Sequence, residues 1–266
     1  MRIYQILNYT KQTNRRIPLS VLEAMEKEWF AGWFDSPYYH LLYGHRDERE
    51  AEAFVQLLAK GPLENRETIV DLGCGKGRHA RALAAFGKQV HGIDLSPESI
   101  AYANGLQTSG AYFSVQDMRR FQVKEPVDAI LNLFTSFGYF DTLEEHIQVL
   151  DCVHRGLREG GLFVLDYFNA QLVQEGEGQF SPADHPSVQF HWTKRIANDS
   201  VYKDIQVRDG EATYHFQERV RLFQADELAS RIESAHMKVQ SIYGDYALGE
   251  FIPSSSPRCI IFAQRV

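Results

Sequence analysis

The stretch VDLGCGKGRHARAL, residues 70–83, decides the fold that we expect for this chain. It passes from apolar residues through glycines at three alternate positions, Gly73, Gly75 and Gly77, into a helix-forming segment. Glycines after a strand let the backbone approach a ligand closely, and the helix that follows presents free amide groups at its N-terminus. The stretch therefore predicts a ligand-binding turn between a strand and a helix.

Two phosphate-binding patterns do not match this turn. Dinucleotide-binding turns read G-x-G-x-x-G, and their third glycine allows close helix packing beneath a pyrophosphate. Here that position is Arg78, and because His79 follows, the turn does not read GxxxxGK[ST] either. An oxidoreductase with a nicotinamide cofactor is thus a disfavoured alternative.

The surrounding sequence predicts an α/β fold. Short apolar runs alternate with helical segments, which is typical of a Rossmann-like, doubly wound, mostly parallel sheet with helices on both faces. One of these helices has a capping box at its start, formed by Thr142 and Glu145. The apolar runs that we interpret as strands are TIVDL, QVHGID, AYFSVQD, VDAILNLF and GLFVLDYF.

From about residue 169 the pattern changes to three strands joined by tight turns, with Asp209-Gly210 as the strongest hairpin signal. We interpret residues 169–221 as an antiparallel β insert that forms a substrate cover or a dimerisation surface. Residues 1–62 are expected to form an N-terminal helical lid, and residues 63–168 and 222–266 the core of the fold.

Composition excludes several classes of function. The formal net charge of −7 argues against nucleic acid as a partner. The three cysteines, Cys74, Cys152 and Cys259, are far apart and show no metal-ligand spacing, which predicts a reducing compartment and no metal site. The first residues lack the apolar core of a signal peptide and no long apolar run follows, so a cytoplasmic location without a membrane partner is expected.

The string Asp71-Leu72-Gly73-Cys74-Gly75-Lys76-Gly77 resembles the first motif of class I methyltransferases that use S-adenosyl-L-methionine. This cofactor contains no phosphate and joins adenosine through a sulfonium to a zwitterionic methionine. The resemblance implies that the backbone at Gly73, Cys74, Gly75 and Gly77 lies close to the cofactor. It also places Asp71 near the ammonium group.

The same resemblance implies further cofactor contacts. Asp94 ends the run QVHGID about twenty residues after the first glycine, where an acid accepts hydrogen bonds from both ribose hydroxyls. Asp117 is placed for the adenine amino group, with Met118 or Leu95 covering the ring, and Leu133 completes the set. The competing interpretations make Asp94 a helix cap and Asp117 a solvated turn residue.

Other segments are similar to the small-molecule branch of this family, and aminosugar N,N-dimethyltransferases of the desosamine type resemble the chain most. The segments are SVQDMRRF, VDAILNLFTSFGYF and LREGGLFVLDYF. The N-terminal signature of these enzymes resembles YYHLLYGHRD, which implies that Tyr38 or Tyr39, Tyr43 and Arg46 form a lid over the cofactor. Arg46 would pair with the methionine carboxylate.

Residues after the fourth strand are expected to face the transferred methyl group, because ligands bind at the carboxyl ends of parallel strands. Enzymes that methylate adenine or glutamine nitrogens carry Asn/Asp-Pro-Pro-aromatic here, whereas residues 132–135 read NLFT. An apolar, aromatic pocket favours a small organic acceptor. No general base stands out; the pocket candidates are Phe134, Ser136, Phe137, Tyr139 and, in the insert, His191.

The sequence therefore predicts methyl transfer to a small-molecule amine, such as an aminosugar, by in-line displacement from S-adenosylmethionine. Methylation of oxygen or carbon is the alternative within this class. A regulator that binds the cofactor without turnover is the alternative outside it.

Overall fold

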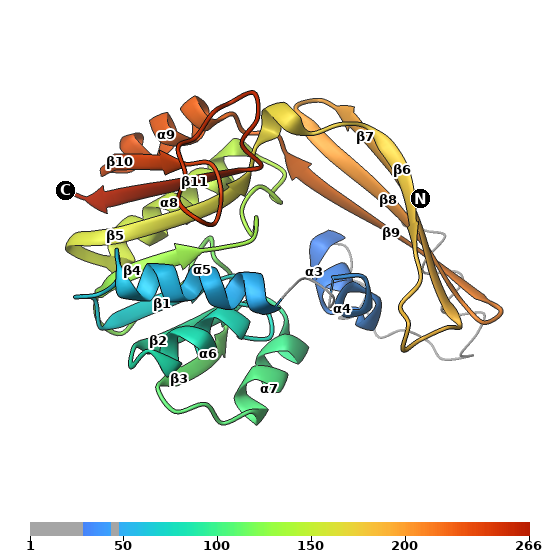
Figure 1. The fold of residues 1–266 in the computed structure, drawn as a ribbon, viewed down its shortest axis with the longest axis horizontal. Helices are drawn as coiled ribbons and strands as arrows, with labels where there is room; N and C mark the ends of the chain where they lie inside the picture. Colours follow the sequence, from blue (N-terminus) through green and yellow to red (C-terminus); the bar gives the residue numbers. More distant parts are fainter. Residues whose placement is uncertain (1–28, 44–47) are drawn as a thin grey trace. The chain divides into compact units, whose positions relative to one another are not determined.

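The computed structural model of the chain describes residues 29–43 and 48–266, and these form two compact units. The core unit comprises the described part of residues 46–174 together with residues 198–201 and 220–266. The sheet unit comprises the described part of residues 1–45 together with residues 175–197 and 202–219. Figure 1 labels the helices and strands of both units.

The core unit is built on a seven-stranded sheet in the order β10-β11-β5-β4-β1-β2-β3. Neighbouring strands from β5 to β3 pair in parallel, whereas β11 pairs antiparallel with β5 and with β10. The fold class predicted from the sequence is therefore confirmed. The strands are β1 (Thr68–Leu72), β2 (Gln89–Asp94), β3 (Ala111–Val115), β4 (Val127–Asn132), β5 (Leu157–Phe168), β10 (Met237–Tyr243) and β11 (Arg258–Arg265).

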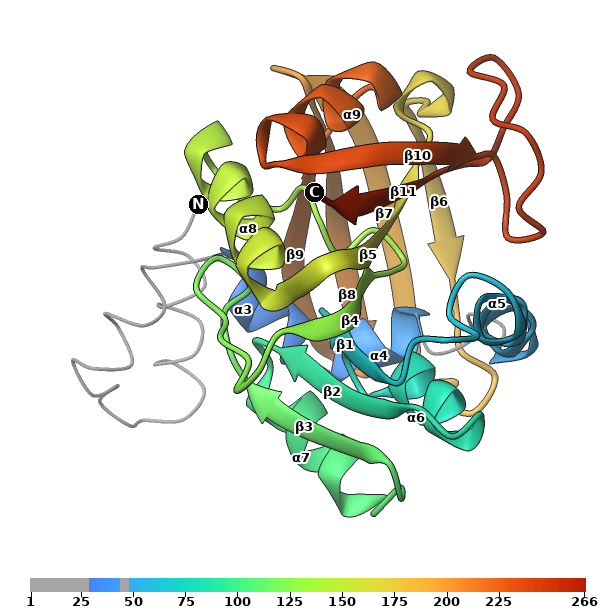
Figure 2. The same cartoon turned by 90° about the vertical axis from the view of Figure 1, so that its left-hand side faces the viewer.

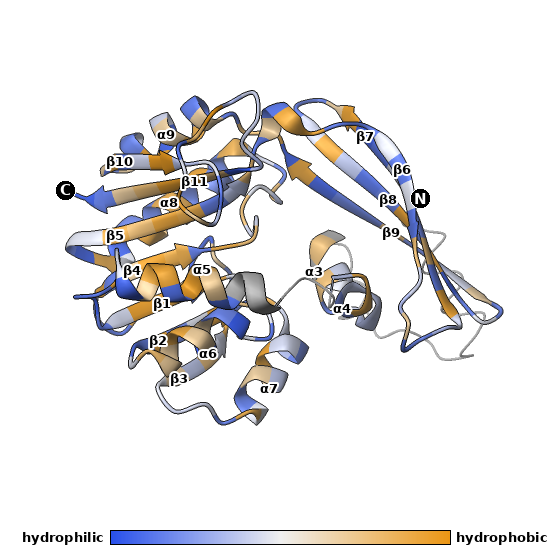
Figure 3. Ribbon diagram, in the orientation of Figure 1, coloured by the Kyte–Doolittle hydropathy of each residue, from blue (hydrophilic) through white to orange (hydrophobic). Residues whose placement is uncertain are grey.

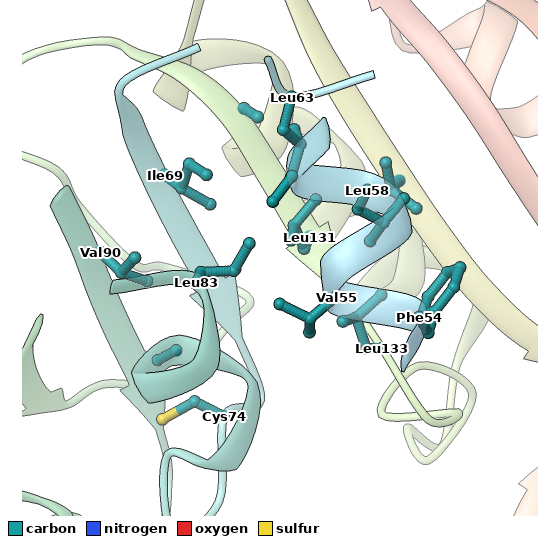
Figure 4. Close-up of a cluster of buried hydrophobic side chains, with 14 of the residues drawn as sticks. Phe54, Val55, Leu58, Leu63, Ile69, Cys74, Leu83, Val90, Leu131 and Leu133 are labelled. Carbon is teal, nitrogen blue, oxygen red and sulfur yellow. The ribbon is translucent and has the colours of Figure 1, made fainter. Parts of the chain in front are cut away.

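Helices cover both faces of this sheet. On one face, Phe54, Val55 and Leu58 of α5 pack with Leu83 of α6 against Ile69 and other strand residues (Figure 4). On the other face α8 and α9 lie together (Figure 2). The core helices are α5 (Glu48–Lys60), α6 (Arg78–Ala85), α7 (Pro97–Gly105), α8 (Leu143–Gly156) and α9 (Ala225–Ser234), with a short 3-10 helix, η1, at Ala170–Leu172.

The middle of the sheet is the most apolar part of the core unit (Figure 3). Every residue of β4 is buried, and so are most residues of β1 and β5. Strand order reverses between β1 and β4, since β2 and β3 lie on one side of β1 and β4 and β5 on the other. In doubly wound sheets such a reversal opens a crevice at the carboxyl ends of the two strands, where ligands bind.

The sheet unit contains a four-stranded sheet in the order β6-β7-β8-β9 and two helices. Trp33 and Leu42 of the helices pack against Val188, Phe190 and Ile205 of the strands. The hairpin expected at Asp209-Gly210 joins β8 to β9. The elements are α3 (Trp29–Phe34), α4 (Pro37–Tyr43), β6 (Gly176–Phe180), β7 (Val188–Ala197), β8 (Ser200–Asp209) and β9 (Ala212–Arg221).

The structure divides the chain at other places than the boundaries expected from the sequence. The expected lid, residues 1–62, is split, because the apolar stripe of α5 packs into the core unit whereas α3 and α4 pack on the antiparallel strands. The insert gains a fourth strand, β6, whose sequence GEGQF carries little strand signal. Whether these strands cover a substrate or form a dimer surface stays a prediction.

No helix within residues 29–43 and 48–266 is long and apolar enough to cross a membrane.

Candidate active site

The glycine turn after β1 adopts a conformation that requires glycine. Gly73, Gly75 and Gly77 have φ angles of 77°, 52° and 75°, in the left-handed region that side chains disfavour. A Cβ atom at Gly73 would lie 2.6 Å from the Cβ of Ser136, whereas one at Gly75 would meet no atom within 4 Å. The first glycine thus permits close packing with the loop after β4, and the second opens space for a ligand.

Asp94, at the end of β2, holds this turn in place. Its Oδ2 accepts a hydrogen bond from the backbone N of Gly75 at 2.7 Å, and its Oδ1 accepts one from the N of Ser96 at 2.9 Å. The N-cap of α7 is Ser96, whose Oγ accepts from the N of Ser99 at 3.0 Å, so the cap interpretation of Asp94 is wrong. A carboxylate oxygen accepts more than one hydrogen bond, so Asp94 can bind the turn and a ligand hydroxyl together.

Asp71 is the most unusual acid of the site. Its side chain is only 1% exposed, and its Oδ2 has no hydrogen-bond partner within the described part of the chain. Burial raises its pKa to about 7. A buried carboxylate oxygen without a partner is unfavourable unless a bound cation or donor reaches it. Asp71 therefore fits the ammonium group of an amino-acid ligand such as the expected cofactor.

The loop after β4 lies directly against the glycine turn. Ser136 Oγ donates to the carbonyl oxygens of Leu133 and Gly73, at 2.9 and 3.3 Å. Phe134 and Thr135 both have left-handed φ angles, 56° and 60°. Consecutive non-glycine residues in this region are strained, and such strain is found mainly at functional sites.

Asp166 of β5 holds the two strained residues. Its Oδ2 accepts from the N of Phe134 at 2.8 Å and from the hydroxyl of Tyr246 at 3.0 Å, and its backbone oxygen accepts from the N of Thr135 at 3.0 Å. Arg258 donates to Asp166 Oδ1 at 2.6 Å and to Thr135 Oγ1 at 3.0 Å. Asp166 is fully buried, so this network sets the loop conformation.

The sequence did not identify Asp166, Tyr246 or Arg258 as site residues. Only the segment around Arg258, SSSPRCIIFAQ, shows a loose likeness to the expected family. Their roles depend on contacts across 32 to 123 sequence positions, for which the sequence carries no local signal.

Aromatic and cationic side chains surround Phe134. Its ring stacks on Tyr246 with centroids 5.4 Å apart and also contacts His79 at 5.0 Å, while the guanidinium of Arg78 lies 4.7 Å from its centre. Burial, followed by the charge of Arg78, lowers the pKa of His79 to about 3. His79 is therefore neutral at physiological pH.

Asp117 has a different environment from the one expected. It is buried, and Arg119 donates to both of its carboxylate oxygens. Burial alone would raise the pKa of Asp117, but the hydrogen bonds and charge of Arg119 outweigh it and hold the pKa below its ordinary value. The interpretation of Asp117 as a solvated turn residue is thus wrong. Its contact with the adenine amino group stays a prediction, and Asp117 would accept that hydrogen bond while it remains paired with Arg119. Next to it, Met118 reaches the glycine turn, 3.6 Å from the Cβ position of Gly73.

Phe137, an expected pocket residue, does not lie at the surface. It is 1% exposed and packs against His146 and Phe223 in the interior. Phe134 and Thr135 before it have left-handed φ angles, which change the direction of the loop. Among the other pocket and cofactor candidates, Leu133 and the Cys74 side chain are buried in the core, and Ser136, Tyr139 and Leu95 are half-buried.

The remaining predicted residues lie in the sheet unit or outside the described residues. Tyr38 donates to Asp209 at 3.0 Å, and Tyr43 donates to Glu218 at 2.7 Å. His191 lines a groove of about 780 Å³ with residues of all four strands. Arg46 lies outside the described residues. The lid role of Tyr38, Tyr43 and Arg46 and the substrate role of His191 stay predictions.

Metal ligands were not expected. In the portion of the chain that the structure describes, no three His, Cys, Asp or Glu side chains are grouped so that they could hold a metal ion.

Comparison with known proteins identifies related chains. Residues 43–242 match the family model described as "Methyltransferase domain". The putative methyltransferase YqeM of Bacillus subtilis is 27% identical over 211 residues, covering 75% of this chain and 84% of its own length. The dTDP-4-amino-2,3,4,6-tetradeoxy-D-glucose N,N-dimethyltransferase of Saccharopolyspora spinosa is 23% identical over 216 residues, covering 77% of this chain and 84% of its own length.

A solved structure shares the fold. An S-adenosylmethionine-dependent methyltransferase from Clostridium acetobutylicum superposes with a TM-score of 0.72 at 20% sequence identity, covering 89% of this chain and 97% of that one.

Proposed function

The chain belongs to the methyltransferase domain family, and we propose that it transfers a methyl group from S-adenosyl-L-methionine to the amine of a small, aminosugar-like acceptor. The observation that carries the proposal is the buried Oδ2 of Asp71, which has no partner among the residues that the structure describes and lies beside a left-handed glycine turn. An ammonium and a close backbone approach are what this cofactor's methionine end requires. The similar Saccharopolyspora enzyme is named for an aminosugar acceptor, which supports an amine here.

The residues of the core unit divide the binding of the cofactor between them. Asp71 takes the ammonium, and Asp94 takes the ribose hydroxyls while it keeps its bond to Gly75. The open space at Gly75 lets the ligand approach the backbone. When bound, the cofactor supplies a methyl group on a positively charged sulfur.

The chemistry then depends mainly on alignment. Holding two reactants in line can supply ~7–11 kcal/mol toward the barrier. The loop at Phe134 and Thr135, fixed by Asp166 and Arg258, provides a rigid wall next to the turn. A neutral amine already has its lone pair, so no general base is required.

The cofactor is tested by thermal shift with S-adenosylhomocysteine against NAD. A ligand at a hundred times its dissociation constant adds roughly 2.7 kcal/mol of stability, and we expect this shift for S-adenosylhomocysteine alone. Asp94→Ala should reduce the shift, whereas the matched Asp209→Ala, whose carboxylate binds Tyr38 in the sheet unit, should leave it unchanged. Equal shifts for both variants would remove the ribose role of Asp94.

The acceptor is tested by mass spectrometry with pairs of sugar nucleotides that carry an amino or a hydroxyl group at the same carbon. Methylation of the amino member supports the proposal. Methylation of only the hydroxyl member would replace it with the oxygen-methylating alternative.

A further inference from the structure

Tyr246 lies in the segment between β10 and β11, residues 244–257, and contacts the loop after β4 in two ways. Its hydroxyl donates to Asp166 Oδ2 at 3.0 Å, and the same oxygen accepts from the backbone N of Phe134 at 2.8 Å. Its ring stacks on the ring of Phe134, with centroids 5.4 Å apart and an interplanar angle of 16°. One side chain thus acts on the backbone of Phe134 through Asp166 and on its ring directly.

The backbone that carries Tyr246 is fixed by its own hydrogen bonds. The N of Gly244 donates to the carbonyl oxygen of Gly249 at 2.8 Å. Asp245 Oδ1 accepts from the N of Ala247 at 2.9 Å and from the N of Gly249 at 3.0 Å. An aspartate that binds the backbone two residues later stabilises a tight turn. Tyr246 therefore extends from a turn whose two ends are tied together.

The ring of Tyr246 is also supported away from the loop after β4. Phe54 of α5 lies 4.8 Å from it, measured between ring centroids, and the guanidinium of Arg258 lies 5.5 Å from its centre. The side chain is half-buried. Contacts with α5, with β11 and with Phe134 together restrict the position of this ring.

The loop after β4 needs such support because its conformation is unfavourable. Phe134 and Thr135 have left-handed φ angles of 56° and 60° without being glycine. Residues in this region persist where the surrounding structure determines their conformation. Asp166 supplies hydrogen bonds to the N of both residues, and Tyr246 supplies the stacking contact with the first.

The place of this loop in the core unit gives its conformation a consequence for a ligand. Ser136 Oγ donates to the carbonyl oxygen of Gly73 at 3.3 Å, so the loop lies on the glycine turn. Both follow strands whose carboxyl ends flank the reversal of strand order, where ligands of doubly wound sheets bind.

We propose that Tyr246 is a positioning residue for methyl transfer, which holds Phe134 and Thr135 in the conformation in which the loop after β4 borders the transferred methyl group. The inference rests on the proposed function, because that function supplies the methyl group. It adds to the site the segment between β10 and β11, which contains none of the residues predicted from the sequence.

Two ligands separate the methyl side of the site from the rest. S-adenosylhomocysteine has no group at the position of the methyl, whereas sinefungin carries an amino group there. Isothermal titration calorimetry measures both with the parent chain, Tyr246→Phe and Tyr246→Leu. Phenylalanine keeps the ring beside Phe134 and loses the bond to Asp166, and leucine loses both contacts.

The matched control is Tyr243→Phe. Tyr243 ends β10, three residues before Tyr246, and its ring packs on Phe262 of β11 with centroids 5.1 Å apart. This variant removes a tyrosine hydroxyl from the same part of the fold. It should change the affinity for neither ligand.

Tyr246→Leu should weaken sinefungin about 3- to 10-fold and leave S-adenosylhomocysteine within about twofold of the parent. This factor corresponds to a loop that keeps its native conformation in roughly a third to a tenth of the molecules, since the apparent affinity falls with that fraction. Tyr246→Phe should weaken sinefungin about two- to threefold, again without an equal loss for S-adenosylhomocysteine.

A residue that only supports the fold would give a different result. Equal weakening of both ligands by the Tyr246 variants, or a lower melting temperature with both affinities unchanged, would overturn the inference and leave the proposed function intact. If Tyr246→Leu does not fold, Tyr246→Phe decides by the same comparison. A parent chain that binds neither ligand would overturn the proposed function, and this inference with it.

Discussion

Replacing Asp71 by asparagine should make the ligand-free protein more stable at alkaline pH while it removes affinity for the cofactor. Burial raises the pKa of Asp71 from the ordinary 3.8 to about 7. The folded protein therefore keeps this proton up to about pH 7, whereas the unfolded chain releases it near pH 4. Stability contributed by this group accordingly falls as the pH rises through that window.

The magnitude follows from the two pKa values. At about 1.4 kcal/mol for each pKa unit, the ionised carboxylate lowers the free energy of unfolding by about 4 kcal/mol above pH 7, of which about 3 kcal/mol develops between pH 5 and pH 8.5. Asparagine does not titrate, and its oxygen can still accept the bond from the backbone N of Ala80. Its buried NH₂ group costs about 1–3 kcal/mol at every pH.

The assay is the melting temperature of the parent chain and of Asp71→Asn at pH 5 and pH 8.5, without ligand. The variant should gain on the parent by about 3 kcal/mol between the two pH values, which corresponds to about 6–12 °C for a chain of this size. S-adenosylhomocysteine should stabilise the parent at pH 8.5 and not the variant. A variant that is less stable than the parent by the same amount at both pH values would show that the Asp71 carboxylate is already paired, and the argument for a ligand cation would fail.

Three further substitutions test the framework of the site by chemical denaturation. Arg258→Met leaves the Asp166 carboxylate buried without its cation and should lower the free energy of unfolding by about 3–5 kcal/mol. Adding Asp166→Asn should recover part of this stability. A loss below about 1 kcal/mol in Arg258→Met would contradict the argument that the buried ion pair holds the loop. His146 is buried, and that burial lowers its pKa to about 4. The free energy of unfolding of the parent therefore falls as the pH drops below about 6.5, because the unfolded chain binds the proton first. Between pH 7 and pH 4, His146→Leu should lose about 3 kcal/mol less of this free energy than the parent. Gly77→Ala would place a Cβ 2.4 Å from the Phe113 ring at a φ of 75°, and it should lower the free energy of unfolding by at least about 1–3 kcal/mol. Adding Phe113→Leu should restore part of this stability. A Gly77→Ala variant as stable as the parent would show that the turn relaxes freely.

Structural features that depend on residues close together in the sequence could be predicted. The capping box of Thr142 and Glu145 is present, because both partners lie within one helical turn. The order of strands and helices in the core unit follows from hydrophobic periodicity alone. Asp94 was expected near the turn because it ends an apolar run about twenty residues after the first glycine, and its hydrogen bond with the N of Gly75 agrees with that location, while its ribose contact stays a prediction.

Features that depend on distant contacts could not be predicted. The hydroxyls of Tyr38 and Tyr43 bond to acids 171 and 175 residues later, so a local signature could not reveal these partners. Phe137 was expected at the pocket because it follows the fourth strand and ligands bind at the carboxyl ends of parallel strands. Phe134 and Thr135 before it have left-handed φ angles, and these residue types give no sign of such angles, since glycine is the residue that normally signals them.

Two buried acids on adjacent strands support the proposal that the ligand binds at the carboxyl edge of the sheet rather than elsewhere in the core unit. Asp128 lies near the amino end of β4, and its carboxylate accepts from the N of Glu67 at 2.6 Å and of Thr68 at 2.9 Å and pairs with Arg158 at 2.7 Å. Asp71 lies near the carboxyl end of β1, is buried still more deeply, and keeps an oxygen without a partner among the described residues. Because buried polar groups in folded proteins are nearly always paired, an exception requires a reason. The same sheet satisfies Asp128 with two neighbouring amides and one arginine, whereas the carboxylate of Asp71 keeps one oxygen unsatisfied by the described residues. The Asp71 oxygen lies beside the left-handed glycine turn and the strained loop after β4. Strained backbone and an unsatisfied buried group are expected together at a functional site, where a ligand completes the structure.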